Sequence, residues 1–254
     1  MITVEGKSVI ITGGAGEIAL AAAKQFLQGG AQVLLVDLDE ARLQAAVATL
    51  HSERVRYRVG DVTSEADTRA YVAYAIEVFG KVDVLLANAG IEGEVAPVSD
   101  YDTANFRRVL DINVTGVFLG IKHVFPVMAA HGGGSIVITS SVAGVSGMSG
   151  LAAYNSSKHA VIGLMRACAK DGGEHNIRVN TVNPAPVEGR MIQSLELGSM
   201  PDTPEMMREA LIESIPLHRY GLPEDVANLM VFLASEESRF LTGGVYMVDG
   251  GMTA

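Results

Sequence analysis

The stretch that decides the fold is Ser8–Ala19, which reads Ser-Val-Ile-Ile-Thr-Gly-Gly-Ala-Gly-Glu-Ile-Ala. Its first five residues form an apolar run that predicts a strand, and helical spacing begins at Ile18. Glycines between the two allow a tight turn and a close backbone approach to a pyrophosphate, while the helix N-terminus favours an anion. Gly14, Gly16 and Ala19 fit the G-x-G-x-x-G/A spacing of dinucleotide-binding loops, and the strand-loop-helix context strengthens the match.

Asp37 closes the next apolar run, Gln32–Val36, and follows Ala19 by 18 residues. A carboxylate at this place can accept hydrogen bonds from a ribose 2′-hydroxyl and repels a 2′-phosphate. The loop before Ile18 holds no basic residue that could receive such a phosphate. The sequence therefore predicts NAD rather than NADP, with a helix cap or turn residue as the alternative for Asp37.

Outward from this start, apolar runs and helical patterns alternate along the chain. Strands are expected at Ser8–Thr12, Gln32–Val36, Val55–Val59, Val82–Ala87, Ser135–Thr139, Ile177–Val182 and Val245–Val248. Helices are expected at Ile18–Leu27, Asp39–Leu50, Ser64–Phe79, Asp111–Ala130, Ala153–Gly172 and Glu224–Leu233. Continuous apolar strands separated by helices indicate a parallel sheet covered on both faces. The predicted fold class is α/β, a doubly wound Rossmann-type sheet of seven parallel strands in a single domain, 1–254.

The segment 185–220 breaks the alternation. It is rich in Met and Leu and is interrupted by Gly198, Pro201 and Pro204. A core helix would not tolerate these interruptions, so we expect a substrate lid on one edge of the sheet. The alternative is ordinary core packing with Met as a gap-filler.

Composition narrows the possible partners and compartment. The chain has 254 residues, 48% of them hydrophobic and 19% charged, with a formal net charge of −10. Such an acidic chain repels phosphate backbones, so nucleic acid is an unexpected partner. Cys168 is the single cysteine, which suits a reducing compartment. The start of the chain lacks a signal-peptide pattern, and no apolar run is long enough for a membrane span, so we expect a cytoplasmic protein without a metal site.

Three further motifs follow in order. Asn88-Ala89-Gly90 closes the fourth predicted strand, Ser140-Ser141 closes the fifth, and Tyr154-Asn155-Ser156-Ser157-Lys158 opens the next helix. Together with the glycine-rich start and Val248-Asp249-Gly250-Gly251, they resemble the short-chain dehydrogenase/reductase family over essentially the whole chain. The resemblance implies an NAD-dependent oxidoreductase acting on a secondary alcohol or ketone. It also implies a homo-oligomer, a tetramer rather than a dimer, assembled through the helices Asp111–Ala130 and Ala153–Gly172.

The resemblance assigns roles to individual residues. Tyr154 is expected to donate and accept the proton, and Lys158 to hold the nicotinamide ribose. Ser141 is expected to hydrogen-bond the substrate oxygen, and Asn113 to support a proton-relay water. These four residues form the expected catalytic set. The expected cofactor contacts are Gly13, Gly16, Glu17, Ile18, Asp37, Asp61, Val62, Asn88, Ala89, Gly90, Tyr154, Lys158, Pro184 and Val187.

The Tyr154–Lys158 pair also has a physical rationale. Residues four apart on a helix share one face. A nearby ammonium favours the phenolate, so we expect Lys158 and the positive nicotinamide ring to lower the pKa of Tyr154 from about 10. The alternative readings are a solvated Tyr–Lys face, a strand end at Ser141, and a hydrogen-bonding kink residue at Asn113.

The substrate pocket is expected to draw on the loops Glu92–Val98 and Val142–Leu151 and on the Met-rich segment. Glu92 and Glu94 could select a polyol or a cation, or could be solvated. Cyclic or aromatic alcohols and sugar-derived polyols therefore both remain open. An apolar wall is suggested by Met148, Met191, Ile192 and Leu195. The expected substrate contacts are Ser141, Met148, Tyr154 and Met191.

The chain departs from the family pattern at two ends of the predicted cleft. Glu17 and Ala19 stand where the family has glycines, and Ala185 and Gly189 stand where it usually has Gly and Thr. A carboxylate beside a pyrophosphate should weaken binding unless Glu17 points to solvent or caps the helix. These departures keep a second hypothesis open, a non-catalytic nucleotide-binding or scaffold protein. A methyltransferase is a third class, but the Tyr154–Lys158 pair has no role in one.

Overall fold

The computed structural model describes residues 3–254 and contains one parallel sheet. Its strand order is β3-β2-β1-β4-β5-β6-β7, so the predicted α/β sheet of seven parallel strands is confirmed. The strands are β1 Ser8–Thr12, β2 Gln32–Asp37, β3 Val55–Val59, β4 Val84–Ala87, β5 Gly134–Thr139, β6 Ile177–Pro184 and β7 Val245–Val248. β6 extends two residues beyond its predicted end, which brings Pro184 into the edge of the sheet.

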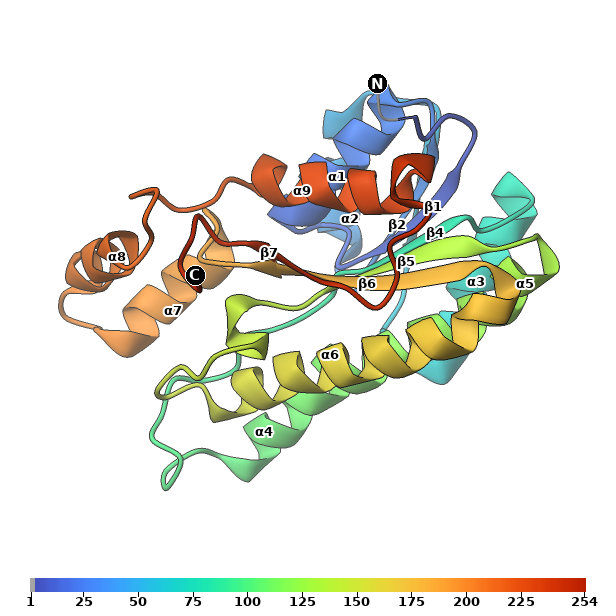
Figure 1. The fold of residues 1–254 in the computed structure, drawn as a ribbon. Coiled ribbons are helices and arrows are strands. Elements are labelled where there is room, and N and C mark those ends of the chain that lie inside the picture. The colour runs from blue at the N-terminus through green and yellow to red at the C-terminus, as the bar shows by residue number, and fades with distance from the viewer. Residues whose placement is uncertain (1–2) are drawn as a thin grey trace.

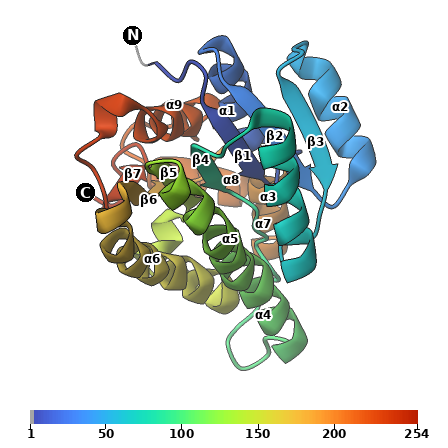
Figure 2. The same cartoon turned by 90° about the vertical axis from the view of Figure 1, so that its right-hand side faces the viewer.

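Helices cover both faces of this sheet (Figures 1 and 2). One layer contains α1 (Glu17–Gln28), α2 (Glu40–Leu50) and α9 (Pro223–Ala234), and the other contains α3 (Glu65–Phe79), α5 (Gly116–Ala130) and α6 (Ala152–Gly172). In β1, Val9 and Ile11 pack into the first layer, while Ile10 packs into the second. Successive strand side chains point to opposite faces, which explains why strands buried on both sides read as unbroken apolar runs.

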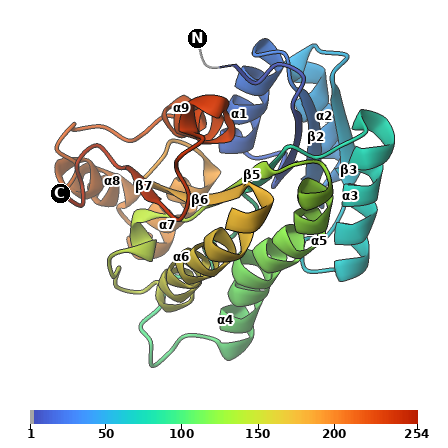
Figure 3. The same ribbon diagram turned by 45° about the vertical axis from the view of Figure 1, so that its right-hand side comes forward.

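The helix expected from Asp111 begins earlier, at Thr103. Here α4 (Thr103–Leu110) leads into α5 through a π-helical turn, Asp111–Thr115, and Asp102 caps α4 by accepting a hydrogen bond from Asn105 N. The sequence pattern missed α4 because most of its residues are polar or exposed and only Val109 is buried. Figure 3 shows this long helix running beside α6.

The chain has no unbroken apolar run of membrane-spanning length, but one helix meets the length and composition of a membrane span. By length and composition alone, the continuous helix 103–130 is long and apolar enough to cross a membrane. Within it, 44% of an apolar 18-residue stretch is buried inside the protein. Its apolar side chains Val117, Ile121, Val124 and Met128 belong to the core beneath the sheet. Packing against the sheet thus accounts for the apolar character of this helix.

The Met-rich segment forms two further helices, α7 (Arg190–Ser199) and α8 (Pro204–Glu213), which lie beyond the carboxyl edge of the sheet (Figure 1). Pro204 opens α8, while Gly198 lies within α7, where an added Cβ would come 2.9 Å from Val95 Cγ2. The two ends of the segment meet, because Glu188 N donates to Gly221 O and Gly221 N donates to Pro186 O. The remaining short helices are the 3-10 turns Val142–Gly144, Gly173–His175 and Glu236–Ser238.

The strand order reverses beside β1, which has β2 on one side and β4 on the other. Connections leave β1 and β4 in opposite directions, so their carboxyl ends part and open a crevice. In doubly wound sheets this crevice is where ligands bind.

Candidate functional site

A cleft of about 840 Å³ occupies this crevice. Its volume lies within the usual range for ligand pockets. Every predicted cofactor and substrate residue lines it, from the glycine loop to the Met-rich segment. These residues are Gly13, Gly16, Glu17, Ile18, Asp37, Asp61, Val62, Asn88, Ala89, Gly90, Ser141, Met148, Tyr154, Lys158, Pro184, Val187 and Met191.

The loop after β1 is a cradle that side chains would fill. Gly13 has φ +64°, and a Cβ there would lie 2.9 Å from Ala89 Cα. Gly14 packs on β2 instead, where an added Cβ would lie 2.8 Å from Leu35 Cβ. Gly16 is the N-cap residue of α1, so the backbone at the mouth of the cleft leads directly into a helix N-terminus. The loop therefore fits a pyrophosphate, with Gly13 and Gly16 on its wall.

Asp37 lies at the end of β2 and is tied to this loop. Its Oδ2 accepts a hydrogen bond of 3.1 Å from Ala15 N. Arg42 donates to the carbonyl oxygen of the same Ala15 at 3.0 Å, and Arg42 also lines the cleft. A carboxylate and a guanidinium are thus both bound to the backbone of Ala15, and both line the cleft. Arg42 was not predicted, because it lies in α2 and not in the loop before Ile18.

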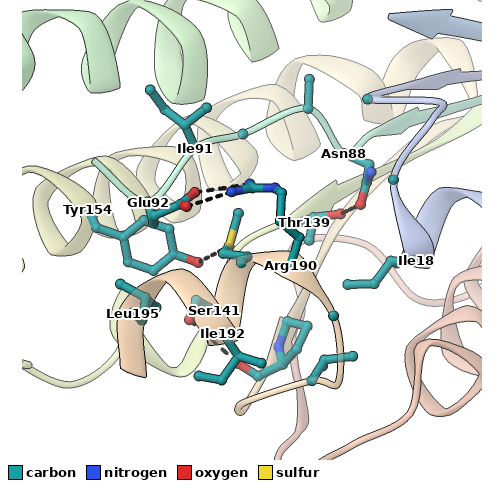
Figure 4. Close-up of a pocket in the computed structure, with 18 of the residues that line it drawn as sticks. Ile18, Asn88, Ile91, Glu92, Thr139, Ser141, Tyr154, Arg190, Ile192 and Leu195 are labelled. Atoms are coloured by element: carbon teal, nitrogen blue, oxygen red, sulfur yellow. Dashed lines mark hydrogen bonds and ion pairs between the residues drawn. The ribbon is translucent and has the colours of Figure 1, made fainter. Parts of the chain in front are cut away.

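Three of the four predicted reactive residues, Ser141, Tyr154 and Lys158, line the other end of the cleft. Figure 4 shows Ser141 and Tyr154 there. Tyr154 and Lys158 share one face of α6, and the Lys158 ammonium lies 5.4 Å from the centre of the Tyr154 ring. Lys158 is only 5% exposed and donates to Thr139 O at 2.8 Å, so the end of β5 fixes its position. Ser141 is also buried, and its hydroxyl accepts a hydrogen bond from Ala143 N.

Burial dominates the proton affinities at this centre. It raises the pKa of Tyr154 to about 12, although a hydrogen bond from Ser141 acts in the opposite direction. It lowers the pKa of Lys158 to about 8, because an ammonium loses its hydration there. The net shift of the Tyr154 pKa in the protein alone is therefore upward, because burial outweighs the Ser141 hydrogen bond. The lowering expected from Lys158 together with the positive nicotinamide ring stays a prediction.

Asn113 lies behind the wall of the cleft rather than on it. It sits in the π-helical turn, is buried, and exchanges two hydrogen bonds with the backbone of Ile91 at 2.8 and 2.9 Å. Its amide also donates to Ser157 Oγ at 3.0 Å. An added Cβ at Gly90 would lie 3.2 Å from Asn113 Oδ1 and 3.5 Å from Lys158 Nζ. Asn113 thus joins the loop after β4 to α6, close to Lys158.

The two acids of the loop after β4 both have protein partners. The Glu92 side chain is only 8% exposed, and its two carboxylate oxygens accept hydrogen bonds from Arg190 at 2.8 and 3.2 Å (Figure 4). Burial alone would raise the pKa of Glu92, but the Arg190 hydrogen bond and its other partners outweigh burial and lower it. Glu94 accepts a hydrogen bond of 2.6 Å from Asp102 N.

The remaining wall beside Tyr154 is apolar. The Tyr154 ring packs with Ala143 and Leu151 and against partly buried side chains from the loops after β4 and β5 and from α7. Tyr154 Oη also lies 3.9 Å from Met191 Sδ. The partly buried side chains in this cluster are Val95, Met148, Met191 and Leu195.

Besides Arg42, sequence reasoning missed three contributing residues. Thr139 supplies the carbonyl that holds Lys158, and its hydroxyl donates to Asn88 Oδ1 at 3.0 Å. Asn183, buried in β6, donates to Ser141 O at 3.0 Å. Arg190 binds Glu92 across 98 residues of sequence. No spacing signal could reveal these pairs, because their partners lie on different strands and loops.

Comparison with known proteins agrees with this arrangement. A family described as enoyl-(acyl carrier protein) reductase matches residues 13–253. The sequence is 35% identical to levodione reductase of Leifsonia aquatica over 250 residues, which cover 97% of this chain and 94% of that protein. It is 38% identical to (+)-borneol dehydrogenase 2 of Salvia officinalis over 258 residues, covering 98% and 90%. The chain belongs to the short-chain dehydrogenase/reductase family.

Solved structures of this family superpose closely on the protein. The crystal structure of levodione reductase matches with a TM-score of 0.95 and 34% identity, covering 97% of each chain. The structure of NAD+-bound xylitol dehydrogenase matches with a TM-score of 0.93 and 35% identity, covering 97% of this chain and 99% of that one. As a short-chain dehydrogenase/reductase, the protein is an oxidoreductase. Within residues 3–254, no group of three or more His, Cys, Asp or Glu side chains is placed to hold a metal ion.

Proposed function

We propose that the protein transfers hydride between NAD(H) and a secondary alcohol or ketone. The observation that carries this proposal is the convergence of Ser141, Tyr154 and Lys158 at one end of a cleft whose other end holds the glycine cradle and Asp37. What NAD(H) supplies when bound is the hydride itself, and the protein's task is to orient substrate and cofactor and move the proton.

In this proposal Tyr154 is the general acid and base. During reduction its Oη gives a proton to the carbonyl oxygen while the carbonyl carbon takes the hydride, and oxidation reverses both transfers. Ser141 holds the same oxygen. The raised pKa of Tyr154, about 12, keeps the phenol protonated as an acid. For oxidation the phenolate must be stabilised, which Lys158 and the positive nicotinamide ring do together.

Asn113 acts in this proposal through its neighbours, as a positioning residue. Its amide fixes the backbone of Ile91 and the hydroxyl of Ser157 beside the reactive helix. A water held nearby could continue the proton path from Lys158.

Asp37 supports NAD rather than NADP. Its carboxylate lies where the ribose hydroxyls are expected and would repel a 2′-phosphate. Arg42 acts in the opposite direction, but its guanidinium is already engaged with Ala15 O. The similar xylitol dehydrogenase structure is the NAD+-bound form, which agrees with this choice.

The substrate we propose is a neutral, largely apolar alcohol or ketone, cyclic rather than a sugar-derived polyol. Glu92 and Glu94 are both occupied by protein donors, so neither is left to select hydroxyl groups or a cation. The wall formed by Met148, Met191 and Leu195 suits apolar carbon. Relatives include a 2,5-dichloro-2,5-cyclohexadiene-1,4-diol dehydrogenase, 36% identical over 255 residues.

We also propose that the chain forms a single domain, in which segment 185–220 acts as a lid on the substrate end of the cleft. Residues from α7 and α8 line the cleft, among them Met191, Ile192 and Met207. A cytoplasmic homo-oligomer, a tetramer before a dimer, is the expected working form, with a small molecule as partner.

The direct test is fluorescence titration of the pure protein with NADH and NADPH, followed by turnover with a panel of cyclic and open-chain alcohols and ketones. The proposal expects tight NADH binding, weak NADPH binding and turnover of some cyclic substrates. NADH binding without turnover across the panel would instead favour the non-catalytic nucleotide-binding protein. Failure to bind either nucleotide would overturn the proposed function.

A further inference from the structure

Three segments that are far apart in the sequence meet at Arg190. Its guanidinium donates to both oxygens of Glu92, on the loop after β4, at 2.8 and 3.2 Å. Its backbone N–H donates to Glu17 Oε1, on the phosphate loop, at 3.2 Å. Arg190 is itself the first residue of α7. One residue of segment 185–220 is thus bonded to both walls of the cleft.

Glu17 and Gly189 are two of the four departures from the family pattern, and they are in contact. A Cβ added at Gly189 would lie 3.1 Å from Glu17 Cδ, and Gly189 has φ +149°, where other residues are strained. The absence of a side chain at Gly189 therefore makes room for the carboxylate of Glu17. Glu17 is larger and Gly189 is smaller than the residues that the family usually has there, and the two changes compensate each other in size.

The charge of Glu17 is offset from three directions. It lies in the first turn of α1, and it accepts the first backbone N–H of α7, so it faces the positive ends of two helix dipoles. The third is the Arg190 guanidinium, which is bound to Glu92 and lines the same cleft as Glu17. This arrangement explains how a carboxylate is accommodated in a phosphate-binding loop.

We propose that Arg190 is a positioning residue that fastens the start of α7 to both walls of the cleft and neutralises Glu17 so that the cofactor pyrophosphate can bind beside it. The proposal rests on the proposed function for its second part only. The first part concerns contacts among the protein's own residues.

Removal of Arg190 should have a consequence that a merely structural residue would not produce. Without the guanidinium, the Glu17 carboxylate faces the cleft with less compensation, and it repels a pyrophosphate. Neutralising Glu17 in the same protein should then restore part of the lost affinity. The substitutions at Arg190 and Glu17 each remove part of a structural bridge. Combined in one protein, they should nevertheless restore part of the nucleotide affinity.

The experiment compares wild type with Arg190→Gln, Glu17→Gln, the double variant and Arg190→Lys. Hydrogen exchange of residues 190–199 in the nucleotide-free protein reports the fastening of α7, and NADH titration reports the charge effect. The control is Arg219→Gln, which removes an exposed ion pair with Asp225 from the same segment.

Arg190→Gln should exchange about tenfold faster in α7 and bind NADH about tenfold more weakly, a change of ~1.4 kcal/mol. The double variant should keep the fast exchange but regain most of the NADH affinity. Arg190→Lys keeps the charge without the forked geometry, so it should bind NADH nearly as wild type does and still exchange faster. Arg219→Gln should match wild type in both measurements.

Unchanged exchange in Arg190→Gln would overturn the fastening role. A double variant that binds NADH as weakly as Arg190→Gln, or more weakly, would overturn the neutralising role. If wild type itself fails to bind NADH, the proposed function falls, while the exchange measurement still decides whether Arg190 fastens α7.

Discussion

The reactive centre on α6 and the segment 185–220 are held in place by different forces. Around Tyr154 and Lys158, buried backbone groups and neutral side chains fix the geometry, such as Thr139 O for Lys158 and Asn183 for Ser141. The segment is held by charged pairs together with a small apolar cluster around Ile192, Ile215 and Tyr220. In the proposed function, chemistry rests on the sheet edge, and substrate selection rests on a segment whose charged pairs can be removed without unfolding the main core.

The charged pairs of the segment reach beyond Arg190. Arg208 of α8 pairs with Glu188 and lies 3.6 Å from Glu196 of α7, and its guanidinium stacks 4.5 Å from the centre of the Tyr220 ring. Tyr220 in turn donates to Glu196 Oε1 at 2.8 Å. These contacts bind α7, α8 and the end of the segment to one another. Changes at the centre should therefore alter turnover, and changes in the segment should alter substrate affinity and local order.

After Tyr154 itself, the largest contrast is expected at Ser141. Replacing it with Ala removes a hydrogen bond to the reacting oxygen, and kcat should fall about a hundredfold while the NADH affinity stays near that of wild type. Ser146→Ala, on the same loop but exposed, is the matched control and should leave kcat unchanged. A Ser141→Ala enzyme within threefold of wild type would remove Ser141 from the mechanism. Steady-state kinetics with a substrate from the panel decides the matter.

A second contrast concerns how much the buried Lys158 ammonium lowers the free energy of unfolding. Burial lowers the pKa of Lys158 from its ordinary 10.5 to about 8 in the folded protein, so between these pH values the unfolded chain binds more protons. The free energy of unfolding should therefore rise with pH across this window through Lys158. From pH 8 to pH 10 the gain is on the order of 2 kcal/mol, before Tyr154 begins to oppose it.

Urea unfolding at pH 7, 8, 9 and 10 measures this contribution as the difference between wild type and Lys158→Met. The control is Lys170→Met, which changes an exposed lysine of the same helix and should leave the pH dependence of wild type intact. Parallel curves for wild type and Lys158→Met would show that Lys158 does not titrate in this window.

The third contrast separates Asp37 from its neighbouring acids. Asp37→Asn removes the negative charge that repels a 2′-phosphate, and Arg42 remains beside it. The ratio of NADH to NADPH affinity should fall about tenfold, by ~1.4 kcal/mol. Glu40→Gln, an exposed acid in the first turn of α2, should leave the ratio as it is. An unchanged ratio in Asp37→Asn would mean that another group selects the nucleotide.

The smallest effect is expected within the segment itself. Tyr220→Phe removes a hydrogen bond to the buried carboxylate of Glu196 and should cost about 1 kcal/mol of local stability. Hydrogen exchange in α7 should rise and KM should increase, with kcat nearly unchanged. Tyr57→Phe removes a comparable but exposed hydrogen bond to Glu40 and should have no such effect. A fall in kcat without any change in exchange would contradict the division between centre and segment.

The sequence predicted the parts of the molecule that local pattern specifies. The strand-loop-helix at Gly13–Ile18, the carboxylate at Asp37 and the Tyr154–Lys158 spacing each lie within one or two neighbouring elements. The seven strands followed from apolar runs, and α3 starts within one residue of the predicted Ser64, which caps it by accepting a hydrogen bond from Asp67 N. All predicted cofactor residues line one cleft because parallel strands place their carboxyl ends together.

What the sequence could not give depends on burial and on distant partners. The direction of the Tyr154 pKa shift follows from its enclosure by α7 and the neighbouring loops, which no spacing shows. Glu17 looked like a defect because its partner, Arg190, lies 173 residues away. Asn113 was expected to support a proton-relay water, and its contacts with Ile91 and Ser157 could not be read from the sequence because these partners lie in other elements.

The most direct test of the central claim is single-turnover reduction by protein preloaded with NADH, with wild type and Tyr154→Phe measured side by side. The absorbance of NADH after mixing with a ketone substrate reports hydride transfer, and fluorescence before mixing reports binding. The account predicts equal loading of NADH and at least a thousandfold slower oxidation in Tyr154→Phe, because proton transfer then lacks its donor. Comparable rates in the two proteins would contradict the assignment of Tyr154 as the general acid.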